Sequence, residues 1–133
     1  MIIISPKFTL KAHERLKSRK LIRQLFDEGK SFSHFPLRVI YLLSDNATTP
    51  LTAGFSVSKR HFKKAADRNK IKRLMREAYR LQKNSLKELL VKNNKSIAVF
   101  FIYTGKDIPN YKDVFEKIGS ALGRFESVYG FHP

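Results

Sequence analysis

One segment of the sequence, residues 59–83, carries more than half of the chain's excess positive charge. It contains 11 Lys or Arg against two acids, a net charge of +9 in a chain whose formal charge is +16. On a helical wheel, apolar residues gather on one side of this segment and cations on the other. The apolar stripe is formed by Ile71, Leu74, Met75 and Ala78, and the opposite face by Asn69, Lys72, Arg73, Arg76, Arg80 and Lys83. The sequence therefore predicts a helix that starts near Asp67 as its cap and runs to about Leu81, with one side packed on a core and the other presenting a cationic face.

A cationic face of this kind indicates an anionic partner. Solvated helices usually place acids four residues from their cations, whereas these five cations have no acid among them and repel one another. Nucleic acid is the expected polyanion. A membrane surface is the alternative, but it requires an apolar insertion face or an anchor. The apolar stretch Met1 to Ile4 is too short for a signal peptide or a membrane span, which favours the cytosol and no membrane partner.

The residues that would indicate an enzyme or metal site are missing from the sequence. The chain has no Cys, which excludes disulfides, thiolate chemistry and zinc fingers. Its four histidines are scattered without metal-ligand spacing, so no metal site is predicted. There is no Gly-rich phosphate loop, no pair of carboxylates in an apolar setting and no Ser nucleophile in a recognisable context beside a His. Any catalysis must therefore come from another molecule.

Three further helices are predicted outside the cationic segment. The first runs from Arg19 to Glu28, where Ser18 can cap the start and Gly29 can end the helix. A short helical stretch is predicted at residues 86–91, and a final helix begins after Asn110, whose side chain can cap it. Residues 5–17 are expected to be extended or irregular.

The strands predicted between these helices form a small sheet. Residues 37–43 are rich in β-branched and aromatic residues, and residues 51–58 alternate between apolar and polar, so the two are predicted to be strands that pair as a hairpin. Residues 31–35 could add a short edge strand. Residues 97–103 are apolar on both faces, which is typical of a central strand. The sequence thus predicts a single α+β domain over residues 1–133, in which a mostly antiparallel sheet packs against helices as a two-layer sandwich.

Residues 54–80, GFSVSKRHFKKAADRNKIKRLMREAYR, resemble the signature of the protein subunit of bacterial ribonuclease P. Residues 14–31, ERLKSRKLIRQLFDEGKS, are similar to the family's opening helix, and the resemblance spans roughly residues 8–125. It implies a ribosomal-protein S5 domain 2-like sandwich with a left-handed βαβ crossover, which general handedness rules would not predict. It also implies that a large catalytic RNA removes the 5′ leader of precursor tRNA with bound Mg²⁺, while the protein improves affinity for substrate and metal.

Two RNA-binding surfaces follow from this resemblance. The surface for the catalytic RNA comprises Lys59, Arg60, Arg68, Asn69, Lys70, Lys72, Arg73, Arg76 and Arg80. A cleft between the first helix and the sheet would bind the single-stranded leader through Ile22, Phe26, Tyr41, Ser56 and Lys59, with bases stacking on the aromatic rings. Two positions depart from the family pattern: Lys70 replaces an Arg and loses its bidentate fork, and Ile22 replaces a common Phe and cannot stack on a base.

Two alternatives use the same cationic helix. A structural RNA-binding protein, such as a ribosomal or assembly protein, would need the cations but not Phe26 and Tyr41 exposed along a groove. A DNA-binding regulator would be expected to form dimers and to discriminate between bases by several kcal/mol, and the sequence shows no helix-turn-helix spacing or zipper. The precursor tRNA and the catalytic RNA are therefore the expected partners, and DNA is not.

Overall fold

The computed structural model describes residues 12–45 and 49–129. The predictions made for residues 1–11 and for the turn at 46–48 lie outside the described residues. In chain order the elements are the 3-10 helix η2 (Ala12–Glu14), α1 (Arg19–Glu28), β1 (Lys30–His34), β2 (Leu37–Asp45), β3 (Leu51–Val57), α2 (Ala65–Gln82), α3 (Asn84–Lys92), β4 (Lys95–Tyr103) and α4 (Tyr111–Tyr129).

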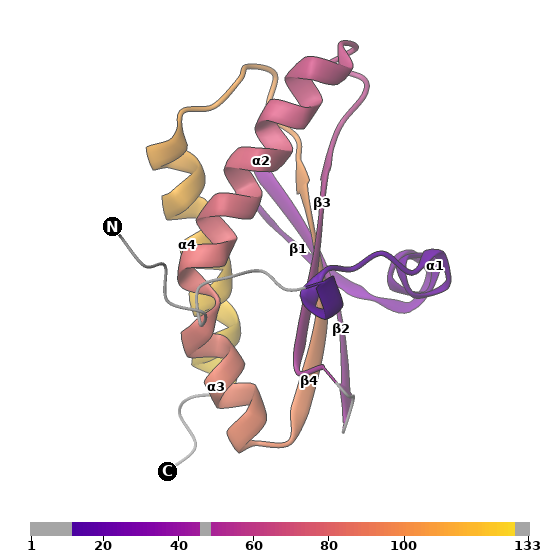
Figure 1. Cartoon of the computed structure of the whole chain (residues 1–133), viewed down its shortest axis with the longest axis vertical. Coiled ribbons are helices and arrows are strands. Elements are labelled where there is room, and N and C mark those ends of the chain that lie inside the picture. The colour runs from indigo at the N-terminus through magenta and orange to yellow at the C-terminus, as the bar shows by residue number, and fades with distance from the viewer. Residues whose placement is uncertain (1–11, 46–48, 130–133) are drawn as a thin grey trace.

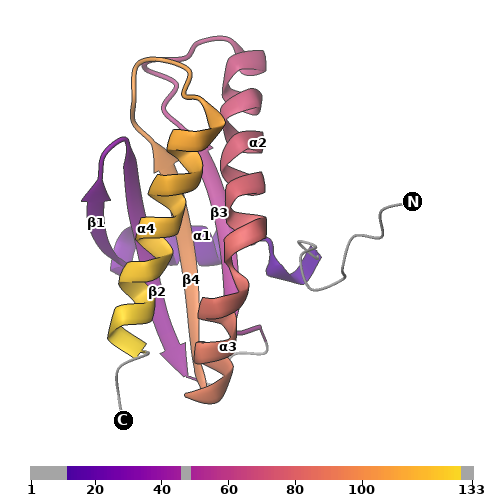
Figure 2. The same cartoon turned by 90° about the vertical axis from the view of Figure 1, so that its left-hand side faces the viewer.

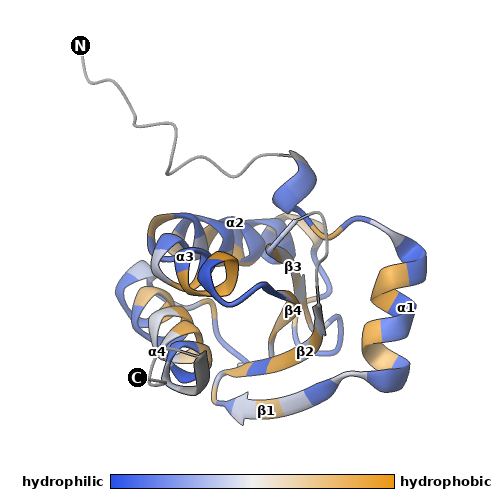
Figure 3. Ribbon diagram, turned by 90° about the horizontal axis from the view of Figure 1, so that it is seen from below, coloured by the Kyte–Doolittle hydropathy of each residue, from blue (hydrophilic) through white to orange (hydrophobic). Residues whose placement is uncertain are grey.

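A four-stranded mixed sheet divides the molecule into two unequal sides (Figure 1). Helices α2, α3 and α4 cover one face, and α1 alone lies against the other, as the end-on view also shows (Figure 3). The strand order is β1-β2-β4-β3, with β4 central, as its apolar residues on both faces predicted. The predicted α+β class is confirmed, and α1 adds a third layer over part of the sheet.

The predicted hairpin between β2 and β3 is wrong. Strand β4 lies between them, antiparallel to β2 and parallel to β3, and β2 forms its hairpin with β1 instead. The alternating pattern of residues 51–58 predicted a strand but not its neighbour. A strand that is apolar on both faces exposes the least apolar surface to water when it lies at the centre of the sheet. Strand β4 therefore takes the place beside β2 that chain order would have given to β3.

The connection from β3 through α2 and α3 to β4 is a left-handed crossover. Figure 2 views the sheet through these helices, with β3 and β4 both running upward and β4 to the left of β3. Nearly all such crossovers are right-handed, so local sequence rules alone would predict the opposite hand. The resemblance to the family predicted this handedness, and the structure confirms it.

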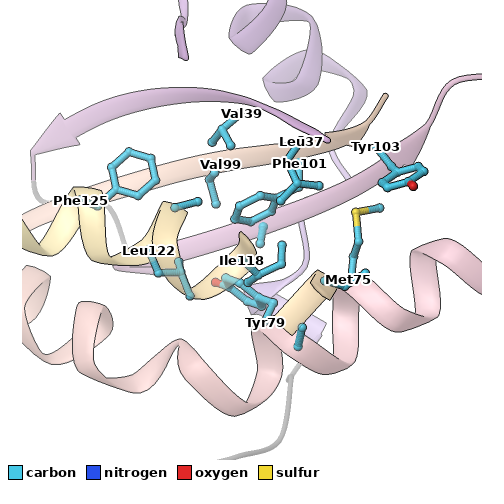
Figure 4. Close-up of a cluster of buried hydrophobic side chains, with 14 of the residues drawn as sticks. Leu37, Val39, Met75, Tyr79, Val99, Phe101, Tyr103, Ile118, Leu122 and Phe125 are labelled. Carbon is cyan, nitrogen blue, oxygen red and sulfur yellow. The ribbon is translucent and has the colours of Figure 1, made fainter. Parts of the chain in front are cut away.

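Two apolar clusters hold the layers together. The larger lies between the sheet and helices α2 to α4, where Tyr79, Phe101, Met75, Ile118 and Leu122 meet (Figure 4). The smaller, here called the α1-side cluster, buries Leu16, Leu25 and Ile40, with Leu21, Ile22, Leu42, Ala98, Phe100 and Ile102 packed against them. Because side chains alternate along a strand, β4 contributes Phe101 to one cluster and Phe100 to the other.

Of the three helix starts for which a capping residue was predicted, two are confirmed. Ser18 Oγ accepts a hydrogen bond from the Leu21 N–H, which confirms the predicted cap of α1. Asn110 Oδ1 likewise accepts from the Asp113 N–H at 2.8 Å at the start of α4. Helix α2 begins at Ala65, two residues before the predicted start, so Asp67 lies within its first turn, where its charge favours the positive end of the helix dipole.

Candidate nucleic-acid interface

Seven of the nine cations and amides predicted to bind the catalytic RNA have side chains without a partner among the described residues. They extend from the end of β3 along α2, which packs on β3 and α4 through Ile71, Met75, Ala78 and Tyr79. Here they are called the cationic face: Lys59, Arg60, Asn69, Lys70, Lys72, Arg73 and Arg76. All but the half-buried Lys72 are exposed, so their charges and amide can reach a ligand.

The other two predicted residues are engaged within the protein. Arg68 Nη1 donates hydrogen bonds to the backbone oxygens of Phe62 and Lys63 at 2.7 and 2.8 Å, which fixes the loop before α2. Arg80 forms an ion pair with Glu77 one turn earlier, and the hydrogen bond from Arg80 lowers the pKa of the Glu77 carboxyl. Their geometry gives both a structural role, so they stand apart from the cationic face.

The prediction that five cations form an unbroken exposed stripe on α2 is wrong at the C-terminal end of the helix. Lys83 is 1% exposed and its ammonium contacts the Glu14 carboxylate, which is equally buried. A helical wheel counts only neighbours on the same helix, and it could not anticipate an acid 69 residues away. The exposed cations therefore end at Arg76, in the middle of α2.

An exposed aromatic pair lies on the α1 side of the sheet. Phe26 is 51% exposed, and its ring meets Phe100 of β4 edge to face, with centroids 5.6 Å apart. A Cβ at Gly54 would approach the Phe100 ring to 2.6 Å, so only glycine lets that ring lie over β3. The predicted cleft residue Ile22 packs against the same α1-side cluster. Phe26 thus offers a ring face to a ligand while Phe100 supports it.

A row of three side chains crosses the same face of the sheet beside this pair. Arg38 of β2 and Ser56 of β3 both lie opposite Ile102 of β4 in register. Ile102 packs with the α1-side cluster, so alternation places Arg38 and Ser56 on that face too, with Arg38 exposed. We call the surface formed by Phe26, Phe100, Ile102, Ser56 and Arg38 the platform. Sequence reasoning missed Phe100, Ile102 and Arg38, although the two-faced apolar pattern of β4 contained a signal for the first two.

Tyr41 does not line this surface. The centroid of its ring lies 5.0 Å from that of Phe125 of α4 and 6.0 Å from that of Phe32 of β1, on the face that carries the larger core cluster. Its neighbours in β2, Ile40 and Leu42, belong to the α1-side cluster instead. Phe26 and Tyr41 are therefore on opposite faces of the sheet, and the single cleft predicted to contain both is corrected to the platform without Tyr41.

The remaining predicted cleft residue, Lys59, follows β3 by two positions and is exposed, so it can serve either surface. The described residues contain no group of three His, Asp or Glu side chains placed to hold a metal ion. No helix in the described ranges is long and apolar enough to cross a membrane. The surfaces themselves offer cations, amides and rings, which bind phosphates and bases.

Comparisons with known proteins place the chain in a family. The family model described as Ribonuclease P matches residues 10–126. The ribonuclease P protein component of Porphyromonas gingivalis is 37% identical over 120 residues, covering 90% of this chain and 88% of that protein, and the one of Chlorobium phaeobacteroides is 34% identical over 125 residues.

The solved structures show the same fold. The ribonuclease P protein of Thermotoga maritima aligns with a TM-score of 0.63 at 28% identity, covering 84% of this chain and 96% of that one. The protein of Staphylococcus aureus aligns with a TM-score of 0.64 at 21% identity, covering 87% and 97%. With a family model that spans most of the sequence and relatives matched over nearly their whole length, this chain belongs to the ribonuclease P protein family.

Proposed function

We propose that this chain is the protein subunit of a ribonuclease P ribonucleoprotein that removes the 5′ leader of precursor tRNA in the cytosol. The cationic face binds the catalytic RNA, and the platform binds the single-stranded leader. Hydrolysis belongs to the RNA subunit and its bound Mg²⁺, as the resemblance to the family implies, and this chain contributes phosphate-binding and base-stacking groups. Family membership supports the assignment of the complex, and the two surfaces support the division of labour.

The observation that carries the leader-binding part is the exposed ring of Phe26 against Phe100, on the sheet face that also carries Arg38 and Ser56. Stacking on an aromatic ring tolerates any base, which a processor of many different precursors requires. Arg38 can neutralise a phosphate, and the Ser56 hydroxyl can bond sugar or phosphate. A purely structural RNA-binding protein would need the cationic face but would gain nothing from an exposed ring supported in this way.

The cationic face acts through charge and counterion release. The slope of log K against log salt grows with the number of phosphates that the protein neutralises. Removal of one Lys or Arg that neutralises a phosphate therefore reduces the magnitude of this slope by about 0.7–0.9. Asn69 adds two donors and an acceptor that can bond ribose or a base edge. Lys70 brings charge without the bidentate fork of an arginine, so its contact with RNA is expected to be less directional.

Cleavage of precursor tRNA by a bacterial ribonuclease P RNA at low Mg²⁺, with and without this protein, tests the proposal. Substrates with and without a 5′ leader are compared, and stimulation that depends on the leader is expected. Tight binding to the RNA without any stimulation would instead support a structural RNA-binding protein. Stimulation that is equal for both substrates would retain the subunit role and remove leader binding.

A further inference from the structure

A small cavity lined by three cations lies at the outer edge of β3 and is here called the edge pocket. Arg15 and Lys17 reach it from the segment between η2 and α1, and Arg76 reaches it from α2. Its volume is about 220 Å³, and Leu16 and residues 53–55 complete its lining. None of the described residues that line it is an acid, so three positive charges converge on one space.

The three cations are available for a ligand. Arg15, Lys17 and Arg76 are exposed, and within the described ranges none of them takes part in an ion pair or a hydrogen bond. The nearest acid in sequence, Glu14, is buried against Lys83 and so does not neutralise them. Cations that converge without a counterion repel one another, and an anion in the pocket would relieve that repulsion.

The wall that carries Arg15 and Lys17 is held in place from both sides. The Leu16 N–H donates to the Ala53 backbone oxygen at 2.8 Å, and Arg15 bridges Ala53 as a short parallel strand would. One residue earlier, the Glu14 carboxylate contacts Lys83, and Lys87 Nζ lies 3.4 Å from it. A binding site whose walls are fixed before the ligand arrives loses less conformational entropy on binding.

We propose that the edge pocket binds one phosphate of an RNA backbone, and that Glu14 is the positioning residue that holds its wall. The proposal rests on the proposed function and deepens it. Arg76 belongs to the cationic face, while Leu16 and Gly54 adjoin the Phe100 ring of the platform. A phosphate bound here therefore lies between the two surfaces, where a strand passing from one to the other would cross the sheet edge.

A charge-matched pair of variants tests the pocket. Arg15→Gln with Lys17→Gln removes two charges from exposed positions, and Lys106→Gln with Lys112→Gln removes two from exposed positions before and at the start of α4. The pocket variant is expected to bind RNA about tenfold more weakly, with a salt slope reduced in magnitude by about 0.7–0.9 for one lost phosphate. The control pair is expected to change affinity less than twofold. Equal effects of the two pairs would overturn the pocket.

Two binding measurements identify the source of the phosphate. The first uses the ribonuclease P RNA alone, and the second uses the assembled holoenzyme with precursor tRNA that carries or lacks a leader. A loss confined to the first assigns the phosphate to the catalytic RNA, and a loss confined to the precursor with a leader assigns it to the leader. Failure of the proposed function can be distinguished from failure of the pocket, because in the first case even the wild-type protein would not stimulate cleavage.

A third substitution shows whether the three cations share one phosphate. If they do, the triple variant Arg15→Gln, Lys17→Gln and Arg76→Gln should lose no more of the salt slope in total than the single variant with the largest loss. Additive losses would mean separate phosphates and would overturn the single site. This result does not depend on how stable each variant is, because the slope reports ions released on binding.

The role of Glu14 is tested by removing both charges of its ion pair. Glu14→Gln with Lys83→Met leaves no fully buried charge without a partner, since Lys87, which also loses its contact with Glu14, is partly exposed; the domain is therefore expected to remain folded. Its RNA affinity should fall as in the pocket variant, and should fall no further when Arg15→Gln and Lys17→Gln are added. Glu14→Asp, which retains the carboxylate, should restore most of the affinity. A folded double variant with wild-type affinity would remove the positioning role.

Discussion

Glu14 and Lys83 form a buried ion pair across 69 residues of sequence, with each side chain 1% exposed. Lys87 approaches the same carboxylate from α3. The pair ties the segment before α1 to the junction of α2 and α3. An interaction between such distant residues fixes tertiary structure, and no local pattern of the sequence encodes it.

Removal of one partner of this pair should destabilise the fold strongly. Glu14→Gln leaves the Lys83 ammonium buried without a countercharge, and the expected loss in the free energy of unfolding is about 3–5 kcal/mol. Urea denaturation followed by circular dichroism measures it. Glu88→Gln, an exposed acid on α3, serves as the control and should change stability by less than about 0.5 kcal/mol. Similar losses in the two variants would show that the ion pair contributes little.

Phe26→Ala should weaken binding of the leader without unfolding the domain. The ring is half exposed, so its removal costs little core packing, while a lost stacking contact costs about 1–3 kcal/mol of affinity. The measurement compares the dissociation constants of precursors with and without a leader. Phe35→Ala, at a ring that is 74% exposed in the β1–β2 turn, is the matched control. Equal effects on both precursors would exclude Phe26 from the leader site.

Tyr41→Ala should act on stability instead. The ring packs against Phe32 and Phe125 on the core face, so its loss leaves a cavity and should cost about 3 kcal/mol in the free energy of unfolding. Tyr41→Phe keeps the ring and should be nearly neutral. Leader-dependent affinity is measured on the folded fraction of each variant. A selective loss of that affinity in a stable Tyr41→Ala protein would contradict the placement of this ring.

Arg73→Ala should lower the affinity for the catalytic RNA and reduce the magnitude of its salt slope by about 0.7–0.9. Arg73 is exposed on the cationic face, and its side chain has no partner among the described residues. Lys92→Ala removes an exposed cation at the end of α3 and should leave the slope unchanged. Titrations at four or five salt concentrations give the slope for each variant. An unchanged slope in Arg73→Ala would exclude that position from the RNA interface.

Tyr79 should make the fold sensitive to alkaline pH. Burial raises the pKa of its hydroxyl, and the nearby Glu14 charge raises it further. The folded state then holds this proton more tightly than the unfolded state, so the contribution of Tyr79 to stability is fully present below about pH 10 and is lost as the pH rises above it. Because the hydroxyl has no hydrogen-bond partner among the described residues, Tyr79→Phe should be neutral near pH 7 and lose less stability above pH 10. Unfolding free energies at pH 7 and 10.5 test both parts.

Local sequence determined the helices and the charge. Ser18 and Asn110 specify helix starts through their own side chains, and the 3.6-residue period of residues 71–78 separates a core side from a cationic side on α2. These features depend on residues within one or two helical turns of each other, so the helix starts and the two sides of α2 can be predicted without knowledge of the fold. The resemblance at residues 54–80 added the family and the handedness of the crossover, which no periodicity contains.

Only the tertiary structure decided which elements meet. It placed β4 between β2 and β3, turned Tyr41 toward α4 rather than α1, and brought Arg15 and Lys17 beside Arg76. It also buried Lys83 against Glu14, which shortened the predicted row of cations. In a strand, a shift of one residue moves a side chain to the other face, and a strand's neighbour is chosen by the apolar surface of the whole sheet. Strand order and facing direction therefore depend on long-range packing, which a local pattern does not contain.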